Sequence, residues 1–298
     1  MKIGIDLGNG FVKCNGSCFA SKVRAGKLAA FGTQRENVHE VVCKVNGVLQ
    51  HFVVGEGEAF TTADRYFTIE YKMCLLTAIA CASSDLVIDA EICVGLPVMQ
   101  FMSPVRFELQ KHLEDMKEEK ITLDGNDRII KIKKVTVFVE GAYVIETKDT
   151  NNVITIDIGA GTVNVIQWEN QGVLHYDTYD KSFLNLYAKI SKHLKDTGRG
   201  TVSPAYIEKH LGEDTYIIDQ KEVSVVDTHF LIEQHVRSLA TKIKEGVFDL
   251  ASASKIQILG GGAAPTFKYW QKMLGDGVEL VADSQFVNSK IFDKVVNM

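Results

Sequence analysis

Hydrophobic and polar residues follow one another along this chain in runs that predict alternating strands and helices. Residues 1–20 form three short apolar runs separated by Asn9-Gly10 and Asn15-Gly16, which are typical hairpin turns. Further apolar runs predict strands at 40–45, 49–54, 86–95, 120–123, 128–134, 135–139, 153–158, 162–168, 215–227 and 255–259. Helical spacing or helix-start signals predict helices at 68–83, 102–117, from about 141, 182–195, from 204, 229–247, after 262 and at 286–297.

Length and composition set the class of protein. The 298 residues correspond to one large domain or two ordinary ones, and 46% hydrophobic residues can bury a substantial core. The net charge of −5 disfavours a broad basic DNA-binding face, although a local patch or an adaptor protein stays open. Neither a signal peptide nor an 18-residue apolar run is evident, so we expect a cytoplasmic protein without a membrane partner.

The cysteines do not indicate a metal centre. All six lie in the first third of the chain, and only Cys14 and Cys18 flank one turn. Without a Cys-x-x-Cys pair or a cluster of histidines, we expect reduced, packing cysteines and no zinc site. The eight histidines are scattered, and none is assigned a role.

Two aspartate–glycine turns carry the chemistry. Asp6-Leu7-Gly8-Asn9-Gly10 and Asp157-Ile158-Gly159-Ala160-Gly161-Thr162 each lie between two apolar runs. Glycine lets a backbone approach an anion and adopt positive φ, and paired carboxylates can hold hydrated Mg²⁺. Either turn alone could be an ordinary hairpin, but two matching turns favour a two-sided phosphate site.

A third glycine element follows the predicted strand 255–259. Gly260-Gly261-Gly262 lies between this strand and a predicted helix, where backbone N–H groups can face a ligand. The turn matches neither G-x-G-x-x-G nor a Walker A loop, so the sequence does not support a Rossmann or P-loop protein.

Together, these three elements resemble the phosphate-1, phosphate-2 and adenosine motifs of the actin, heat-shock chaperone and sugar kinase superfamily. The resemblance implies an α/β, actin-like fold with two RNase H-like domains and ATP with Mg²⁺ in the cleft between them. It implies domain I at 1–150, with an insert at about 21–85 and a C-terminal helix within 275–298 that returns to it. Domain II then covers 151–274, with an insert at about 180–253.

Three stretches are similar to ParM-type plasmid-segregation actins within this superfamily. They are the opening strand and turn at 6–13, Asp64-Arg65-Tyr66, and Asp283-Ser284-Gln285-Phe286 near the C-terminus. Their order along the chain narrows the resemblance to a segregation actin.

The resemblance implies a role for each matching residue. Asp6 and Asp157 would hold Mg²⁺ through water, and Asp157 would also polarise the attacking water. Lys13 would bring positive charge to the phosphates. The backbone contacts to nucleotide would come from Gly8, Asn9, Gly10, Gly159, Ala160, Gly161, Thr162, Gly260, Gly261 and Gly262.

The resemblance implies two further assignments. Glu140 falls where these proteins carry a Glu or Gln that positions the attacking water, and it ends a strand and opens a helix, as that role requires; the alternative is a solvated acid at a helix N-terminus. Glu208 or Lys209 would contact the ribose, with ordinary helix surface as the equal alternative.

The implied function is an ATPase that polymerises with ATP, or alternatively GTP, and hydrolyses it in the filament. Its partners would be further copies of itself and a small DNA-binding adaptor of the ParR type, with no direct nucleic-acid contact. The rivals are a small-molecule kinase of the same superfamily and a membrane-associated scaffold. The final helix at 286–297 has few basic residues, which favours packing over membrane binding.

Overall fold

The computed structural model describes residues 1–28, 35–148, 151–180 and 183–298. The chain forms two compact units, one of residues 1–140 with 286–298 and the other of residues 141–285. Each unit has its own cluster of buried hydrophobic side chains.

Within the described residues, the first unit contains a ten-stranded sheet in the order β3-β2-β1-β8-β10-β9-β5-β6-β4-β7. Its strands are β1 (Lys2–Leu7), β2 (Phe11–Cys14), β3 (Ser17–Ala20), β4 (Lys22–Ala25), β5 (His39–Val45), β6 (Val48–Val54), β7 (Glu58–Ala59), β8 (Val87–Leu96), β9 (Glu118–Leu123) and β10 (Asn126–Val139). β8 pairs in parallel with both β1 and β10, whereas the other neighbours in this sheet are antiparallel. The three predicted strands in residues 1–20 are confirmed.

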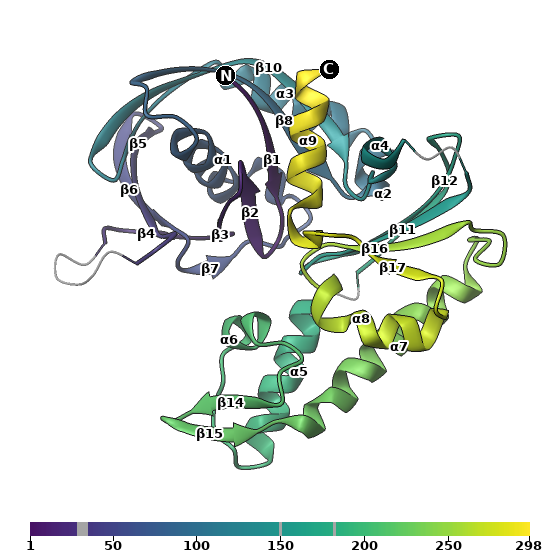
Figure 1. Cartoon of the computed structure of the whole chain (residues 1–298). Helices are drawn as coiled ribbons and strands as arrows, with labels where there is room; N and C mark the ends of the chain where they lie inside the picture. Colours follow the sequence, from purple (N-terminus) through teal and green to yellow (C-terminus); the bar gives the residue numbers. More distant parts are fainter. Residues whose placement is uncertain (29–34, 149–150, 181–182) are drawn as a thin grey trace. The chain divides into compact units, whose positions relative to one another are not determined.

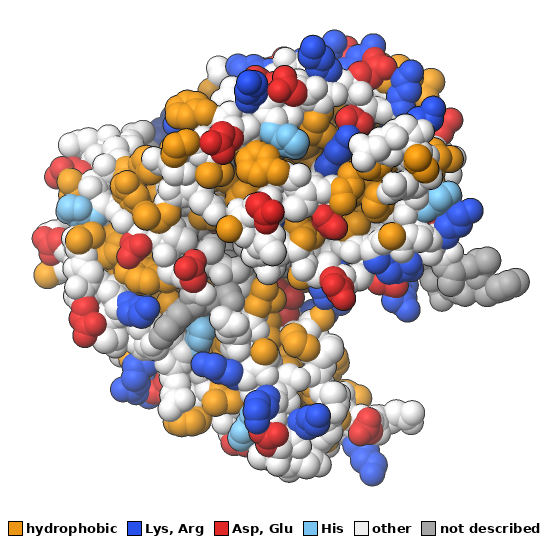
Figure 2. Space-filling model, turned by 180° about the vertical axis from the view of Figure 1, so that it is seen from behind, with side chains coloured by type: hydrophobic (Ala, Val, Ile, Leu, Met, Phe, Trp, Pro, Cys, Tyr) orange, Lys and Arg blue, Asp and Glu red, His pale blue; other side chains and the backbone are white. Residues whose placement is uncertain are grey.

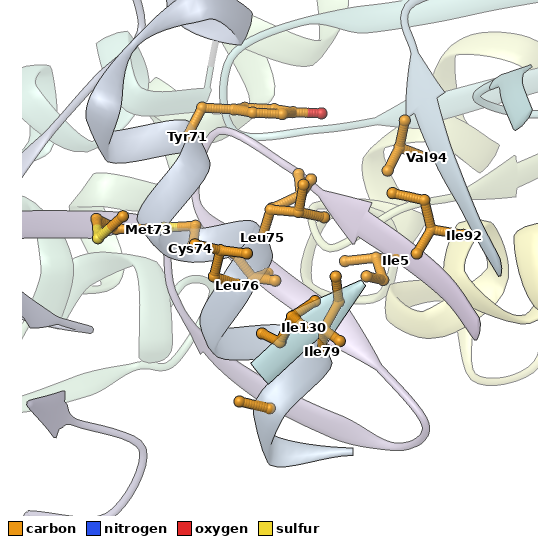
Figure 3. Close-up of a cluster of buried hydrophobic side chains, with 14 of the residues drawn as sticks. Ile5, Tyr71, Met73, Cys74, Leu75, Leu76, Ile79, Ile92, Val94 and Ile130 are labelled. Atoms are coloured by element: carbon orange, nitrogen blue, oxygen red, sulfur yellow. The ribbon is translucent and has the colours of Figure 1, made fainter. Parts of the chain in front are cut away.

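Helix α1 (Ile69–Cys81) lies against the curved sheet of the first unit (Figure 1). Its residues are apolar nearly all round, which is the pattern of a buried helix, and the side chain of Thr68 caps its first turn. Figure 3 shows side chains of α1, β1, β8 and β10 meeting in one buried cluster.

The remaining helices of the first unit are η1 (Arg65–Phe67), α2 (Val98–Phe101), α3 (Val105–Asp115) and α9 (Val287–Asn297). Helix α9 packs on β1 so closely that a side chain at Gly4 would overlap the backbone of Asp293. The Gly4 N–H also donates to Asp293 Oδ1 at 3.2 Å. The last helix therefore belongs to the core of the first unit.

The second unit is built on a five-stranded sheet in the order β13-β12-β11-β16-β17. Its strands are β11 (Val153–Ile158), β12 (Val163–Glu169), β13 (Gly172–Tyr179), β16 (Lys255–Leu259) and β17 (Val278–Leu280). A separate hairpin consists of β14 (Thr215–Ile218) and β15 (Lys221–Ser224). The helical segments are α4 (Val144–Thr147), α5 (Phe183–Asp196), α6 (Pro204–Lys209), η2 (Val226–Thr228), α7 (His229–Glu245), α8 (Ala263–Leu274) and η3 (Ser284–Phe286).

Several predicted elements differ from the structure. The strands expected at 128–134 and 135–139 form the single strand β10, whose pairing with β8 shifts in register between Ile132 and Lys134. The helix expected at 102–117 is shorter, because α3 begins directly after Pro104, a residue that is tolerated at the start of a helix but not in its interior, and the separate turn of α2 ends before the expected range. The helix expected from about 141 is limited to the single turn of α4. The run 215–227 is a hairpin instead of one strand, because Asp219 and Gln220 both adopt positive φ and turn the chain.

Candidate functional site

The first aspartate–glycine turn connects β1 to β2 in the first unit. Asp6 and Lys13 lie directly opposite each other in the ladder, and Lys13 Nζ is 3.0 Å from Asp6 Oδ2. Both residues are buried, with 4% and 9% of their surface exposed. The predicted metal-orienting carboxylate and the predicted phosphate-binding cation therefore form an ion pair beside the turn.

Two carbonyl groups of this turn accept hydrogen bonds, whereas its three amides have no backbone acceptor among the described residues. Ser21 donates from Oγ to Gly8 O at 2.6 Å and from its backbone N–H to Gly10 O at 2.9 Å. The amides of Gly8, Asn9 and Gly10 donate to no backbone acceptor among the described residues. Half-buried amides of this kind can bind an anion.

Arg65 is a residue of this site for which sequence reasoning assigned no role. Its guanidinium donates to Leu7 O at 3.0 Å and to Gly8 O at 3.1 Å. The only signal for it in the sequence was the stretch Asp64-Arg65-Tyr66, which does not show where the side chain points.

Glu140 follows β10 at the same edge of the first sheet. Its N–H donates to Leu96 O at 2.9 Å, and β1, β8 and β10 run parallel, so Asp6 and Glu140 share the carboxyl edge of three strands. Ligands of parallel sheets bind outside this edge. Burial raises the pKa of Tyr66 and of Tyr71, and the negative charge of Glu140 adds to the rise while Arg65 opposes it.

The second turn connects β11 to β12 in the second unit, in the same register as the first. Asp157 lies opposite Asn164, as Asp6 lies opposite Lys13, and Asp157 is 4% exposed. The second hairpin therefore repeats the buried carboxylate without a lysine at the matching position.

The amides of the second turn divide into two kinds. The Gly159 N–H donates to Thr162 O at 2.9 Å and closes the turn, so it does not face outward. The amides of Ala160, Gly161 and Thr162 donate to no backbone acceptor in the part of the chain that the structure describes. Ala160 O accepts from Leu184 N at 3.1 Å, which ties the turn to α5.

The three consecutive glycines lie between β16 and α8 and have different surroundings. A Cβ at Gly260 (φ +91°) would lie 2.5 Å from Ile158 O and would also overlap the Asp157 carboxylate. A Cβ at Gly262 would lie 2.5 Å from Ile158 Cγ2. Gly260 and Gly262 are thus required for packing against β11, and Gly261 is the exposed member of the three.

The C-terminal stretch that resembles the segregation actins meets this glycine turn. Gly260 N–H donates to Ser284 O at 2.9 Å, and Ser284 is buried. A Cβ on Gly261 would lie 4.0 Å from Gln285 Cγ. The segment 283–286 thus supports the glycine turn, a role that its sequence alone did not reveal.

The two candidate ribose residues lie on α6. Glu208 is half-buried and Lys209 is exposed. After this helix, Gly212 approaches the start of α8 closely enough that its Cβ would lie 3.1 Å from Pro265 O. The segment after α6 is therefore next to the helix that follows the three glycines.

The donor set suits a hydrated magnesium ion better than a closed metal cage. Among the described residues, no group of three or more His, Cys, Asp or Glu side chains is arranged to hold a metal ion. Mg²⁺ retains several waters and binds through one or two carboxylates together with substrate phosphates, and the buried aspartate of each turn is a carboxylate of this kind. No helix in the described ranges is long and apolar enough to cross a membrane.

Comparisons with known proteins identify the fold of the chain. Residues 4–142 match the family model of the N-terminal domain of actin-like proteins. The whole chain also superposes on the ParM of a 15-stranded filament from Clostridium botulinum, with a TM-score of 0.83 and 19% identity over 99% of this chain and 98% of that one. The chain has an actin-like fold of the ParM type.

Two other solved structures share this actin-like fold. An archaeal actin homologue in complex with ADP has a TM-score of 0.81 and 14% identity, covering 100% of this chain and 99% of that one. The apo ParM of psk41 has a TM-score of 0.68 and 21% identity, covering 99% and 96%. No curated protein sequence matches the chain. The predicted actin-like α/β fold is confirmed.

Proposed function

We propose that this actin-like protein is a Mg²⁺-dependent ATPase that polymerises with ATP and hydrolyses it in the filament. The observation that carries the proposal is the pair of matching turns. Each turn combines a buried aspartate with three consecutive backbone amides, those of residues 8–10 in one turn and 160–162 in the other. These amides donate to no backbone acceptor among the described residues, so they can bind an anion. The proposal requires both turns, one from each unit, to contact the same nucleotide.

The phosphates would be bound mainly by backbone groups. On one side the donors are the amides of Gly8, Asn9 and Gly10, and on the other those of Ala160, Gly161 and Thr162. Lys13, which now pairs with Asp6, has a flexible side chain that can turn toward a phosphate once a metal ion takes up the charge of Asp6. Bound Mg²⁺ would neutralise charge on the phosphates.

Hydrolysis would depend on positioning a water molecule and compensating charge, since phosphoryl transfer needs little covalent chemistry from the protein. Asp157 would accept a hydrogen bond from this water and polarise it, and Glu140 would orient it. The position of Glu140 at the carboxyl edge of β10, on the same edge as Asp6, supports this assignment.

The adenosine would lie along the turn at 260–262, with Gly261 as the contact residue and Glu208 or Lys209 at the ribose. ATP is the expected nucleotide, with GTP as the alternative. An actin homologue of the same fold has been solved with ADP, which supports nucleotide binding here.

The comparison with ParM supports self-association, because a ParM of this fold forms a 15-stranded filament. For plasmid segregation, a ParR-type adaptor would carry the DNA contact in the cytoplasm. Figure 2 shows acidic and basic side chains interspersed over one face of the molecule, and the net charge is −5. Both observations favour an adaptor over direct DNA binding.

Steady-state phosphate release at increasing protein concentration tests this proposal. With ATP and Mg²⁺ and no other substrate, the rate per molecule should rise steeply above a critical concentration, because assembly activates hydrolysis. A rate that requires an added sugar would instead indicate the small-molecule kinase. Co-sedimentation with anionic liposomes would favour the membrane scaffold.

A further inference from the structure

The guanidinium of Arg65 contacts the carbonyl side of the first phosphate turn, and the function proposed above assigns it no role. Arg65 is 5% exposed. Besides its bonds to Leu7 O and Gly8 O, its Nε donates to Phe60 O at 3.2 Å. One side chain thus joins the end of β1 to the segment that leads into η1.

The position of Arg65 is set by the hydrophobic core of the first unit. Its Cζ lies 5.2, 5.4 and 5.8 Å from the ring centroids of Phe60, Tyr66 and Tyr71. Thr68 Oγ1 donates to Arg65 O at 2.8 Å and accepts from the first turn of α1. Tyr71 belongs to the buried cluster of Figure 3, so the guanidinium is held by elements that are already packed.

The guanidinium of Arg65 contacts neutral groups, namely carbonyl oxygens and aromatic rings. Among the described residues, no carboxylate lies within ion-pair distance of its guanidinium. A buried cation that is not paired with an anion adds positive potential to its surroundings. This positive potential acts on the turn at residues 8–10, because the guanidinium is hydrogen-bonded to Gly8 O.

The two bonds to the turn also determine where its amides point. In a trans peptide the C=O and the following N–H point in opposite directions. Arg65 holds the carbonyls of Leu7 and Gly8 on its own side, so the N–H groups of Gly8 and Asn9 point to the other side. These are two of the three amides assigned to phosphate binding.

We propose that Arg65 is a positioning residue for the β- and γ-phosphates of the nucleotide, acting through the carbonyls of Leu7 and Gly8. This role rests on the proposed nucleotide site. A planar fork is needed to reach two carbonyls and Phe60 O together, so lysine, with a single ammonium group, cannot replace it.

The alternative is an anchor that stabilises the fold without affecting ligands. The two roles differ in how they treat nucleotides with different numbers of phosphates. A positioning role affects ATP and ADP but spares AMP, which lacks the phosphates that the turn would contact. If Arg65 is only an anchor, replacing it lowers the melting temperature and weakens the binding of ATP, ADP and AMP by the same factor.

The test compares Arg65→Lys with Arg106→Lys in the full-length protein. Arg106 is a matched control, because it belongs to the same unit and its Cζ lies 4.3 Å from the Phe101 ring, with no contact to the turn. Dissociation constants for ATP, ADP and AMP are measured with Mg²⁺ by calorimetry. We expect Arg65→Lys to weaken ATP and ADP by about tenfold or more and AMP by less than about twofold, with no change in the control.

Equal weakening of all three nucleotides, or unchanged ATP binding, would overturn the positioning role. If the wild-type protein binds no ATP, the proposed function itself fails, so the two failures are distinguishable. If Arg65→Lys does not fold, Ser21→Ala removes another donor to Gly8 O and should weaken ATP, but not AMP, by about threefold. Unchanged ATP binding by Ser21→Ala would then contradict the proposal.

Discussion

Replacing Gly260 with alanine would place a methyl group between two strands of the second unit. The new Cβ would lie 2.5 Å from Ile158 O and 2.7 Å from Ile158 N, and it would overlap the Asp157 carboxylate. These neighbours are backbone or a buried side chain, so they have little room to move. The substitution therefore tests whether the glycine turn and the second phosphate turn form one packed structure.

The expected cost has two parts. Alanine at a φ of +91° costs roughly 1–2 kcal/mol through backbone strain. Forcing the methyl group against β11 adds about 1–3 kcal/mol of overpacking. The control is Gly275→Ala in the same unit, where φ is +98° but no atom lies within 4 Å of the new Cβ, so only the first part applies.

The assay is thermal unfolding of both variants beside the wild type. Gly260→Ala should melt roughly 3–10 °C below Gly275→Ala, since 1 kcal/mol corresponds to a few degrees for a domain of this size. Because the methyl group displaces Asp157, ATP turnover should also fall in Gly260→Ala and stay unchanged in the control. Equal melting temperatures for the two variants would refute the close packing of Gly260 against β11.

Three other predictions follow from single residues. Asp157→Ala should retain nucleotide binding by equilibrium titration but lose at least about 100-fold in turnover; unchanged turnover would remove Asp157 from the catalytic assignment. Glu140→Ala should slow phosphate release and lengthen filament lifetime by microscopy, whereas equal lifetimes would contradict its water-positioning role. The hydrogen bond that Arg199 donates to Asp227, and secondarily the one from His193, lowers the pKa of the Asp227 carboxyl. Because this pKa is lower in the folded than in the unfolded chain, the Arg199–Asp227 ion pair stabilises the fold above about pH 4, and the stabilisation is lost as the pH falls further. Because the Asp227 side chain is 45% exposed, Asp227→Asn should cost about 0.5–1 kcal/mol in urea unfolding at pH 7 and less at pH 3; an equal cost at both pH values would contradict the ion pair.

The sequence predicted the elements whose signals are local. At Asn15-Gly16 both residues adopt positive φ, as a hairpin turn of this type requires, and the strands around this turn and around Asn9-Gly10 are confirmed. The hairpins at Asn170-Gln171 and Asp219-Gln220 have no glycine at their centres, although all four residues adopt positive φ. Their strands were missed or merged because glutamine, and not the glycine that usually marks such a turn, stands at the second central position of each.

Sequence motifs predicted only those parts of the candidate site that come from residues adjacent along the chain. Asp6 and Asp157 follow apolar runs and could be identified from the motif alone. Arg65 could not, because its contact with Leu7 and Gly8 joins residues far apart in the sequence. Gly260 was predicted to contact the adenosine, which stays a prediction; that a Cβ there would overlap the Asp157 carboxylate is a contact that spacing does not reveal.

Electron microscopy of the purified protein with and without nucleotide tests the central claim most directly. With ATP and Mg²⁺ the account predicts regular filaments, which disappear when EDTA removes the metal ion or when ATP is omitted. Well-folded protein that binds ATP and Mg²⁺ but stays monomeric at all concentrations tested would contradict it.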